Sequence, residues 1–373
     1  MQCIMQSLLQ YFGLAEKNSN LFIFNSNVMI KFINKTLLFV VPFFVLYFFT
    51  LFFYKTPKTG DLLRLGYIPC INRDYRQHFK FTEEEKFTKL SSKPKEKNYK
   101  IMTIGDSFSE QEGWGYKRYL ANDFTVLHVD RFFTEKEEPI QALINMSNGD
   151  FFNHYKVQYV ILQNVERHFI DRVKKIDING KTDVSKIDSM IVNHKNSLTN
   201  NEYKFFSRLT LEFPFYHFPR YFVDKNYLSN NKVYNFETNT KSLFSNNTNK
   251  LLFYYEDLSS TEQNNKLENA INLNNILNQL SRKLKEKNIK LIVLPSPDKY
   301  DLYYDCIVDK KTLTKPIFFD NFKKLNKAYI YIDSKEILSK KLNNQKDIYY
   351  FDDTHWSPIA SELIAKKIKE EIK

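Results

Sequence analysis

Short apolar runs alternate with amphipathic stretches from about residue 100 onward. Apolar runs at 100–104, 124–129 and 159–162 predict buried strands, and the stretches at 107–121 and 139–153 between them predict helices. Strands that alternate with helices in this way are typical of a parallel sheet with helices on both faces. The first half of the chain therefore indicates an α/β domain.

The same alternation returns in the last third of the chain. It predicts a helix over 262–287, strands over 290–294 and 329–333, and a final helix that starts near Pro358. Proline in the first turn of a helix is favourable, which supports that start. We therefore expect one domain over 100–373.

Residues 172–270 interrupt this alternation. They are rich in Asn, Lys, Ser and aromatic residues, and we interpret them as an irregular insertion that covers the site or contacts substrate. A solvated excursion with a small aromatic core explains the composition equally well. The aromatic and neighbouring residues are Phe205, Phe206, Phe213, Phe215, Tyr216, His217 and Phe218.

An uncharged apolar run at 36–54 precedes the predicted domain. Its roughly 19 residues are enough to cross a bilayer as a helix. No small-residue cleavage site follows, which favours an uncleaved anchor over a signal peptide. Lysines lie on both sides of the run, so the positive-inside rule gives no orientation; they are Lys31, Lys35, Lys55 and Lys58.

The remaining boundaries follow from the anchor. We expect an N-terminal extension over 1–35, with Met29 as an alternative translation start, and a charged linker over 55–99 between the anchor and the domain. No function is assigned to residues 1–28.

The chain is strongly basic, with a formal net charge of +12 and an isoelectric point of about 9.2. The lysines are spread rather than clustered and no nucleic-acid motif is present, so nucleic acid is not the expected partner. Attraction to an anionic envelope polymer or lipid surface is a weaker interpretation.

The three cysteines lack the spacing of metal ligands. Cys70 and Cys306 form a disulfide or stay buried thiols.

Two short motifs carry candidate chemistry. The first apolar run ends in Gly105-Asp106-Ser107, which places a serine at the carboxyl end of a strand, where open α/β sheets carry their sites. Gly105 permits a sharp turn, Asp106 can cap the next helix, and the Ser107 N–H can serve as an oxyanion donor. Each motif residue also has a purely structural explanation.

The second motif lies near the other end of the chain, where Asp352 and Asp353 precede His355. A serine is a weak nucleophile until an imidazole accepts its proton and a carboxylate orients that imidazole. A helix cap with a structural histidine would explain this motif by itself. The two motifs together favour nucleophilic acyl transfer, with no metal and no cofactor expected.

These motifs resemble those of the SGNH (GDSL-like) hydrolase superfamily. The string Asp353-Thr354-His355-Trp356 is more similar to its DHHW and alginate O-acetyltransferase-like subgroup. Val160–Arg167, a strand that ends in a Glu-Arg pair, and Leu291–Tyr300, a strand followed by proline and lysine, also resemble that subgroup. The resemblance extends over residues 60–373, strongly at both ends and weakly between 172 and 270.

The chain departs from the subgroup in two respects. In the alginate acetyltransferases the Asp-x-His block precedes the Gly-Asp-Ser block, whereas here it follows. The superfamily pattern selects Asp352 as the acid and the subgroup pattern selects Asp353; we favour Asp352 slightly and retain both. The usual Gly-x-Asn-Asp block is missing. Asn164 is the nearest candidate for its oxyanion asparagine, although an asparagine bonded to its own turn is as good an explanation.

The resemblance implies a flavodoxin-type sheet and a membrane-anchored serine O-acyltransferase that acetylates a cell-envelope or extracellular polysaccharide. Ser107 would carry the acyl group, and Gly105 and Asn164 would lie at the oxyanion. A multi-spanning membrane protein would donate the acyl group. The chain would be a single-pass protein of a bacterial inner membrane with its domain outside the cytoplasm. The alternatives are an esterase with the same site and a non-catalytic envelope assembly protein.

Overall fold

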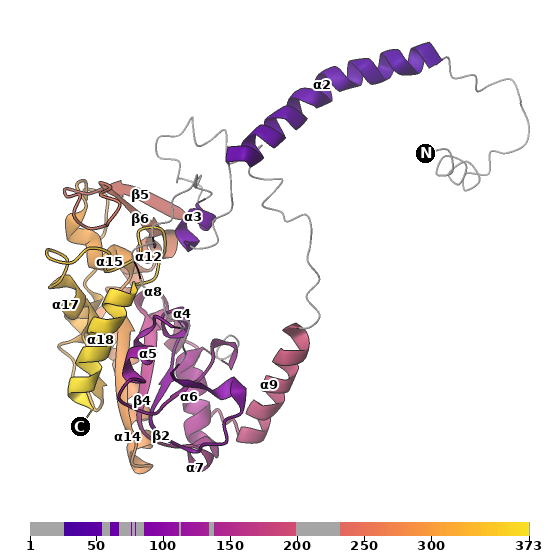
Figure 1. Ribbon diagram of the computed structural model, residues 1–373. Coiled ribbons are helices and arrows are strands. Elements are labelled where there is room, and N and C mark those ends of the chain that lie inside the picture. The colour runs from indigo at the N-terminus through magenta and orange to yellow at the C-terminus, as the bar shows by residue number, and fades with distance from the viewer. Residues whose placement is uncertain are drawn as a thin grey trace, which may run out of the picture.

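The structure, a computed structural model, describes the chain in several segments separated by gaps (Figure 1). The described residues are 26–53, 60–66, 76, 79, 86–111, 113–133, 138–198 and 232–372. All statements about the fold refer to these residues.

A six-stranded parallel sheet forms the centre of the domain, with strand order β1-β3-β2-β4-β7-β8. The central strands are almost entirely buried, as expected for a parallel sheet with helices on both faces. Their carboxyl ends meet at one edge of the sheet. The strands are β1 (Thr88–Lys89), β2 (Asn98–Ile104), β3 (Val126–His128), β4 (Lys156–Val165), β7 (Lys290–Ser296) and β8 (Ile330–Tyr331).

Helices cover both faces of this sheet (Figure 1). Leu143, Phe169 and Leu277 belong to the core on one face, and Phe108, Trp356 and Ile364 belong to the core on the other. The first face carries α6 (Pro139–Asn148), α7 (Phe151–His154), α8 (Glu166–Val173), α9 (Val184–Leu198), α14 (Leu267–Glu286) and α16 (Phe318–Phe322). The second carries α4 (Ser107–Glu110), α5 (Tyr116–Leu120), α15 (Lys299–Tyr303), α17 (Ser334–Ser339) and α18 (Pro358–Glu371).

Smaller elements complete the described structure. A separate antiparallel hairpin, β5–β6, packs Leu251 and Phe253 into the core of the second face. The remaining elements are α2 (Ser26–Phe53), α3 (Asp61–Leu65), η1 (Leu90–Ser92), η2 (Arg131–Phe133), β5 (Val233–Glu237), β6 (Lys250–Tyr254), α12 (Tyr255–Ser259), α13 (Thr261–Asn264) and η4 (Tyr304–Cys306).

The fold class predicted from the alternation is confirmed, but several helices are shorter than predicted. The helix expected over 107–121 is split into α4 and α5, because Gly113 and Gly115 lie between them and glycine is a poor helix former. The helix expected over 139–153 ends at Asn148, just before Gly149, and α7 follows. The final helix starts at Pro358 as predicted.

Two predicted segments contain helices or strands among the described residues. The linker expected over 55–99 contributes β1 to the sheet, and its helix α3 contacts the loop that carries His355. The insertion expected over 172–270 contains α9 and the hairpin, so part of it is regular structure. The aromatic residues between 205 and 218 lie outside the described residues.

Cys70 also lies outside the described residues, so its pairing with the half-buried Cys306 remains a prediction.

Helix α2 contains the apolar segment predicted to be an anchor. Its span Met29–Phe49 is long and apolar enough to cross a membrane, and none of the most apolar window is buried inside the protein. A core helix of a soluble domain would be mostly buried. Length and composition fit either a membrane anchor or a signal sequence.

Candidate active site

Ser107 lies at the carboxyl end of β2, as the first residue of α4. Asp106 precedes it and caps the helix, because its Oδ1 accepts a hydrogen bond from the Phe108 N–H at 3.1 Å. The other carboxylate oxygen accepts bonds from the Val165 N–H and from Arg172, each at 2.7 Å. Asp106 therefore joins the end of β2 to the end of β4 and fixes the position of the serine.

Gly105 is needed for space at this turn. A Cβ atom here would lie 2.4 Å from Ser109 Oγ and 2.6 Å from Gln163 Oε1. The Gln163 oxygen cannot readily retreat, because it accepts the Asp106 N–H at 3.1 Å while its amide nitrogen donates to Ser296 at 2.9 Å. Close approach of neighbouring side chains therefore explains the glycine. Its predicted place at the oxyanion remains a prediction.

His355 is held by the turn that precedes α18. The Tyr350 N–H donates to the His355 carbonyl at 3.2 Å, within a bridge between Tyr349 and the fully buried Trp356. The Phe108 ring lies 4.8 Å from the imidazole and 5.0 Å from the Trp356 ring, measured between centroids. The aromatic packing therefore places the histidine directly against the start of α4.

A continuous hydrogen-bond chain joins the serine, the histidine and one aspartate. His355 Nε2 lies 2.7 Å from Ser107 Oγ, and His355 Nδ1 lies 2.6 Å from Asp353 Oδ1. The same Asp353 oxygen also accepts the His355 backbone N–H at 3.1 Å. In this structure Asp353, and not the slightly favoured Asp352, contacts the imidazole: the Asp353 side chain turns back onto its own loop, whereas Asp352 faces Arg76 at 3.4 Å.

Electrostatics reinforce this chain. Burial would raise the pKa of Asp353, but the adjacent His355 and Arg76, the latter at 2.5 Å, hold that pKa well below its usual value. Burial would lower the pKa of His355, but the Asp353 carboxylate outweighs burial and raises that pKa above its ordinary value. The pair thus favours an ionised aspartate that can stabilise an imidazolium.

Lys299 holds the loop that carries Asp353 and His355, a role that the sequence did not reveal. Its fully buried ammonium donates to the carbonyls of Tyr350 and Phe351 at 2.7 Å and of Asp353 at 3.1 Å. Burial lowers the pKa of Lys299 to about 8 despite the nearby aspartates. The lysine lies in Leu291–Tyr300, the segment that resembles the alginate acetyltransferase subgroup, but the sequence alone assigns it no role.

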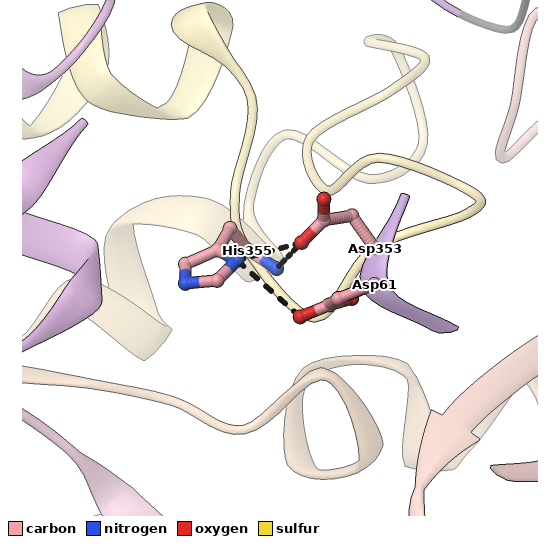
Figure 2. Close-up of side chains that lie close together, drawn as sticks. All are labelled: Asp61, Asp353 and His355. Carbon is pink, nitrogen blue, oxygen red and sulfur yellow. Dashed lines mark hydrogen bonds and ion pairs between the residues drawn. The ribbon is translucent and has the colours of Figure 1, made fainter. Parts of the chain in front are cut away.

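A second carboxylate approaches the histidine from α3. Asp61 Oδ2 lies 3.7 Å from His355 Nδ1, and Figure 2 shows the carboxylates of Asp61 and Asp353 on the same edge of the imidazole. Asp61 also accepts the Thr354 N–H at 2.8 Å and the Thr354 hydroxyl at 2.6 Å. Burial, followed by the charge of Asp353, raises the pKa of Asp61 to about 6. Sequence reasoning missed this residue because it lies in the predicted linker.

Asp61, Asp353 and His355 also offer three donor atoms within 4.8 Å of one another, close enough to hold a metal ion. A metal at this position would replace the proton on Nδ1 and would compete with Arg76 for Asp353. The present contacts match a hydrogen-bonded serine–histidine–aspartate arrangement more closely.

Asn164 lies fully buried near the end of β4. Its Oδ1 accepts a hydrogen bond from Arg172 at 2.8 Å, and its Nδ2 is buried without a partner among the described residues. Its role at the oxyanion remains a prediction.

The neighbouring Arg167 binds Asp257 at 3.1 Å and Asp298 at 2.7 Å. These ion pairs join the ends of β4 and β7.

Two hollows meet at Ser107 and His355. The larger has a volume of about 380 Å³ and is bordered by side chains from α3, α8 and the hairpin, including Asp61, Arg172 and Tyr254. The smaller has a volume of about 260 Å³ and is lined by Arg76, Glu110, Gln111, Trp114 and Tyr350. The serine–histidine pair is therefore reachable from two sides.

The parallel sheet carries Gly-Asp-Ser at one strand end and Asp-x-His before the last helix. Residues 249–373 match the family model of the SGNH hydrolase-like domain of acetyltransferase AlgX. The matched segment contains His355 and both candidate acids but not Ser107, and it begins inside the predicted insertion. The match supports an enzyme of the acetyltransferase or esterase type. No curated protein matches the chain.

Proposed function

We propose that this protein is a membrane-anchored serine O-acyltransferase that acetylates a cell-envelope or extracellular polysaccharide. The observation that carries the proposal is the hydrogen-bond chain from Ser107 through His355 to Asp353. Side chains from two distant parts of the sequence meet in the arrangement that acyl transfer requires. The AlgX family match supports acetyl as the transferred group.

In the first half-reaction, Ser107 Oγ attacks the carbonyl carbon of an acyl donor while His355 Nε2 accepts the hydroxyl proton. Asp353 stabilises the imidazolium that forms. The histidine then gives the proton to the leaving group, and an ester remains on the serine. The Ser107 backbone N–H, at the first position of α4, is the proposed oxyanion donor.

In the second half-reaction, an acceptor hydroxyl gives its proton to His355 Nε2 and attacks the ester carbonyl. Ser107 leaves with a proton from the imidazolium, and the acyl group remains on the acceptor. The two hollows at Ser107 and His355 support transfer between two substrates, because donor and acceptor can approach from different sides. Hydrolysis would need room for the acyl donor only, because water replaces the acceptor.

The rest of the proposal concerns location and partners. Helix α2 supports an anchor, because its apolar window is unburied. The resemblance to the alginate acetyltransferase group supports an inner-membrane location, a domain outside the cytoplasm and a multi-spanning membrane protein as acyl donor.

The test uses the full chain in detergent micelles with p-nitrophenyl acetate as donor. Reactions with and without neutral and uronic-acid oligosaccharides are analysed by mass spectrometry for acetylated sugar and free acetate. We expect an acetyl-enzyme on the peptide that contains Ser107 and transfer to sugar in preference to water. Ser107→Ala is the matched control.

Each other result has a definite meaning. Release of acetate alone, with every acceptor, would identify an esterase with the same site. Equal acetylation by wild type and Ser107→Ala would overturn the serine mechanism. If the protein neither turns over the ester nor forms an acetyl-enzyme with a reagent that acylates active-site serines, a non-catalytic assembly protein is favoured.

A further inference from the structure

We propose that Asp61, in the segment that follows α2, is a positioning residue that orients His355 as a second carboxylate beside Asp353. This inference rests on the proposed acyl transfer at Ser107. It adds a group from outside both sequence motifs, and it makes the site dependent on the segment next to the apolar helix.

The contacts of α3 support this role. Asp61 binds the Thr354 N–H at 2.8 Å and the Thr354 hydroxyl at 2.6 Å, and the Leu62 N–H donates to the Asp352 carbonyl at 3.1 Å. Three hydrogen bonds therefore hold the two residues on either side of Asp353. A shift of α3 would move the acid that contacts the imidazole.

The start of α3 is fitted closely to the same loop. Gly60 has φ +86°, a conformation that favours glycine, and a Cβ there would lie 2.6 Å from Asp352 Oδ2 and 2.9 Å from the Asp352 carbonyl oxygen. The Leu62 and Leu63 side chains are buried in a small core with Val233 and Leu252. The chain enters α3 in one orientation, which directs Asp61 toward His355.

The charge of Asp61 acts on the imidazole as well. Its Oδ2 lies 3.7 Å from Nδ1, beyond hydrogen-bond length but within the range of a strong charge interaction. Figure 2 shows both carboxylates beside Nδ1, with Nε2 on the opposite side of the ring. Two acids thus favour the tautomer with a proton on Nδ1 and a free Nε2, which is the form that can accept the serine proton.

The test compares wild type with Asp61→Asn in the full chain, by the pH dependence of kcat/KM for p-nitrophenyl acetate. The groups that act on His355 are Asp61 from α3, Asp353 from its own loop, Ser107 from α4 and Arg167 from α8. Because a nearby anion raises the pKa of an imidazole, loss of the Asp61 charge should move the acid limb down by about one pH unit. We expect kcat at the plateau to fall about tenfold with little change in KM.

The matched control is Asp130→Asn, because Asp130 makes the same pair of contacts, to the N–H and hydroxyl of Ser91 at 2.8 and 2.7 Å, away from His355. Its acid limb should equal that of wild type. Asp61→Ser, a second neutral variant, should show the same shift as Asp61→Asn. Thermal unfolding confirms that each variant is folded.

Several outcomes would overturn the inference. An unchanged acid limb in folded Asp61→Asn or Asp61→Ser would show that the charge does not act on His355. A raised KM at constant kcat would make Asp61 a substrate contact instead. Activity that EDTA removes and Zn²⁺ restores in wild type would make it a metal ligand. Ser107→Ala separates the two proposals, since retained activity there refutes the acyl-transfer mechanism itself.

Discussion

Replacement of Asp353 by asparagine tests the site most directly, because the structure predicts how the new amide would turn. Asp353 Oδ2 accepts from Arg76 at 2.5 Å, while Oδ1 faces His355 Nδ1 at 2.6 Å. An amide NH₂ group would face a donor in either orientation, but the charged Arg76 guanidinium at 2.5 Å repels it more strongly than the neutral His355 backbone N–H at 3.1 Å. The asparagine oxygen would therefore stay with Arg76, and its nitrogen would face Nδ1.

That orientation reverses the imidazole tautomer. With an N–H donor beside Nδ1, the proton of neutral His355 moves to Nε2, which can no longer accept the Ser107 proton. A wrong tautomer of this kind costs about ten thousandfold in kcat elsewhere. Asp61, 3.7 Å from Nδ1, still favours the correct tautomer. We therefore expect a loss of about a thousandfold, or ~4 kcal/mol of transition-state stabilisation.

The assay is ester turnover by purified full-length protein, with thermal unfolding to confirm the fold. The matched control is Asp352→Asn, since Asp352 faces Arg76 at 3.4 Å and its loss should change kcat by no more than about threefold. Equal losses in the two variants, or near-normal kcat in folded Asp353→Asn, would refute the tautomer argument.

Four further results are expected. Ser107→Ala should lower turnover by several orders of magnitude without a change in thermal unfolding, and mass spectrometry should find no acetyl-enzyme. In wild type, kcat/KM should fall as pH drops through an apparent pKa above that of a free imidazole, because the raised pKa of His355 keeps the base protonated to higher pH; an acid limb below the pKa of a free imidazole would contradict this. Gly105→Ala should destabilise the fold by about 2 kcal/mol, measured by denaturant unfolding, because its Cβ would overlap Ser109 and Gln163. A reporter active only outside the cytoplasm should work when fused after residue 373 and fail when fused near residue 30; the reverse pattern would place Ser107 in the cytoplasm.

Local sequence patterns predicted the elements that bring Ser107 and His355 to the site. A buried strand that ends in Gly-Asp-Ser, and an Asp-x-His turn before a helix with an initial proline, are each visible within about ten residues. The choice between Asp352 and Asp353 was not visible, because both spacings allow an acid to reach a histidine. The backbone of the turn decided it, since Asp353 Oδ1 binds both the His355 N–H and Nδ1.

The supporting groups could not be predicted because their roles arise only in the folded molecule. Asp61 contacts Thr354 across 293 positions, and Arg76 contacts Asp353 across 277. Both lie in a charged stretch with no periodicity, which is typical of a linker. Lys299 follows a clear strand signal, but nothing in the sequence shows that its ammonium binds three carbonyls of a distant loop.

The distance along the chain between Ser107 and His355 has a consequence for synthesis and for heat inactivation. The two residues are 248 positions apart, and α18, which follows the histidine, packs beside α5 near the serine. A ribosome must therefore add 248 residues after Ser107 before the nucleophile can meet its base, so a product that ends before His355 carries an inert serine. His355 lies in a loop outside the central sheet, and loops open at a lower free energy than core strands. Enzyme activity should accordingly disappear on heating while the far-ultraviolet circular dichroism of the central sheet is still unchanged.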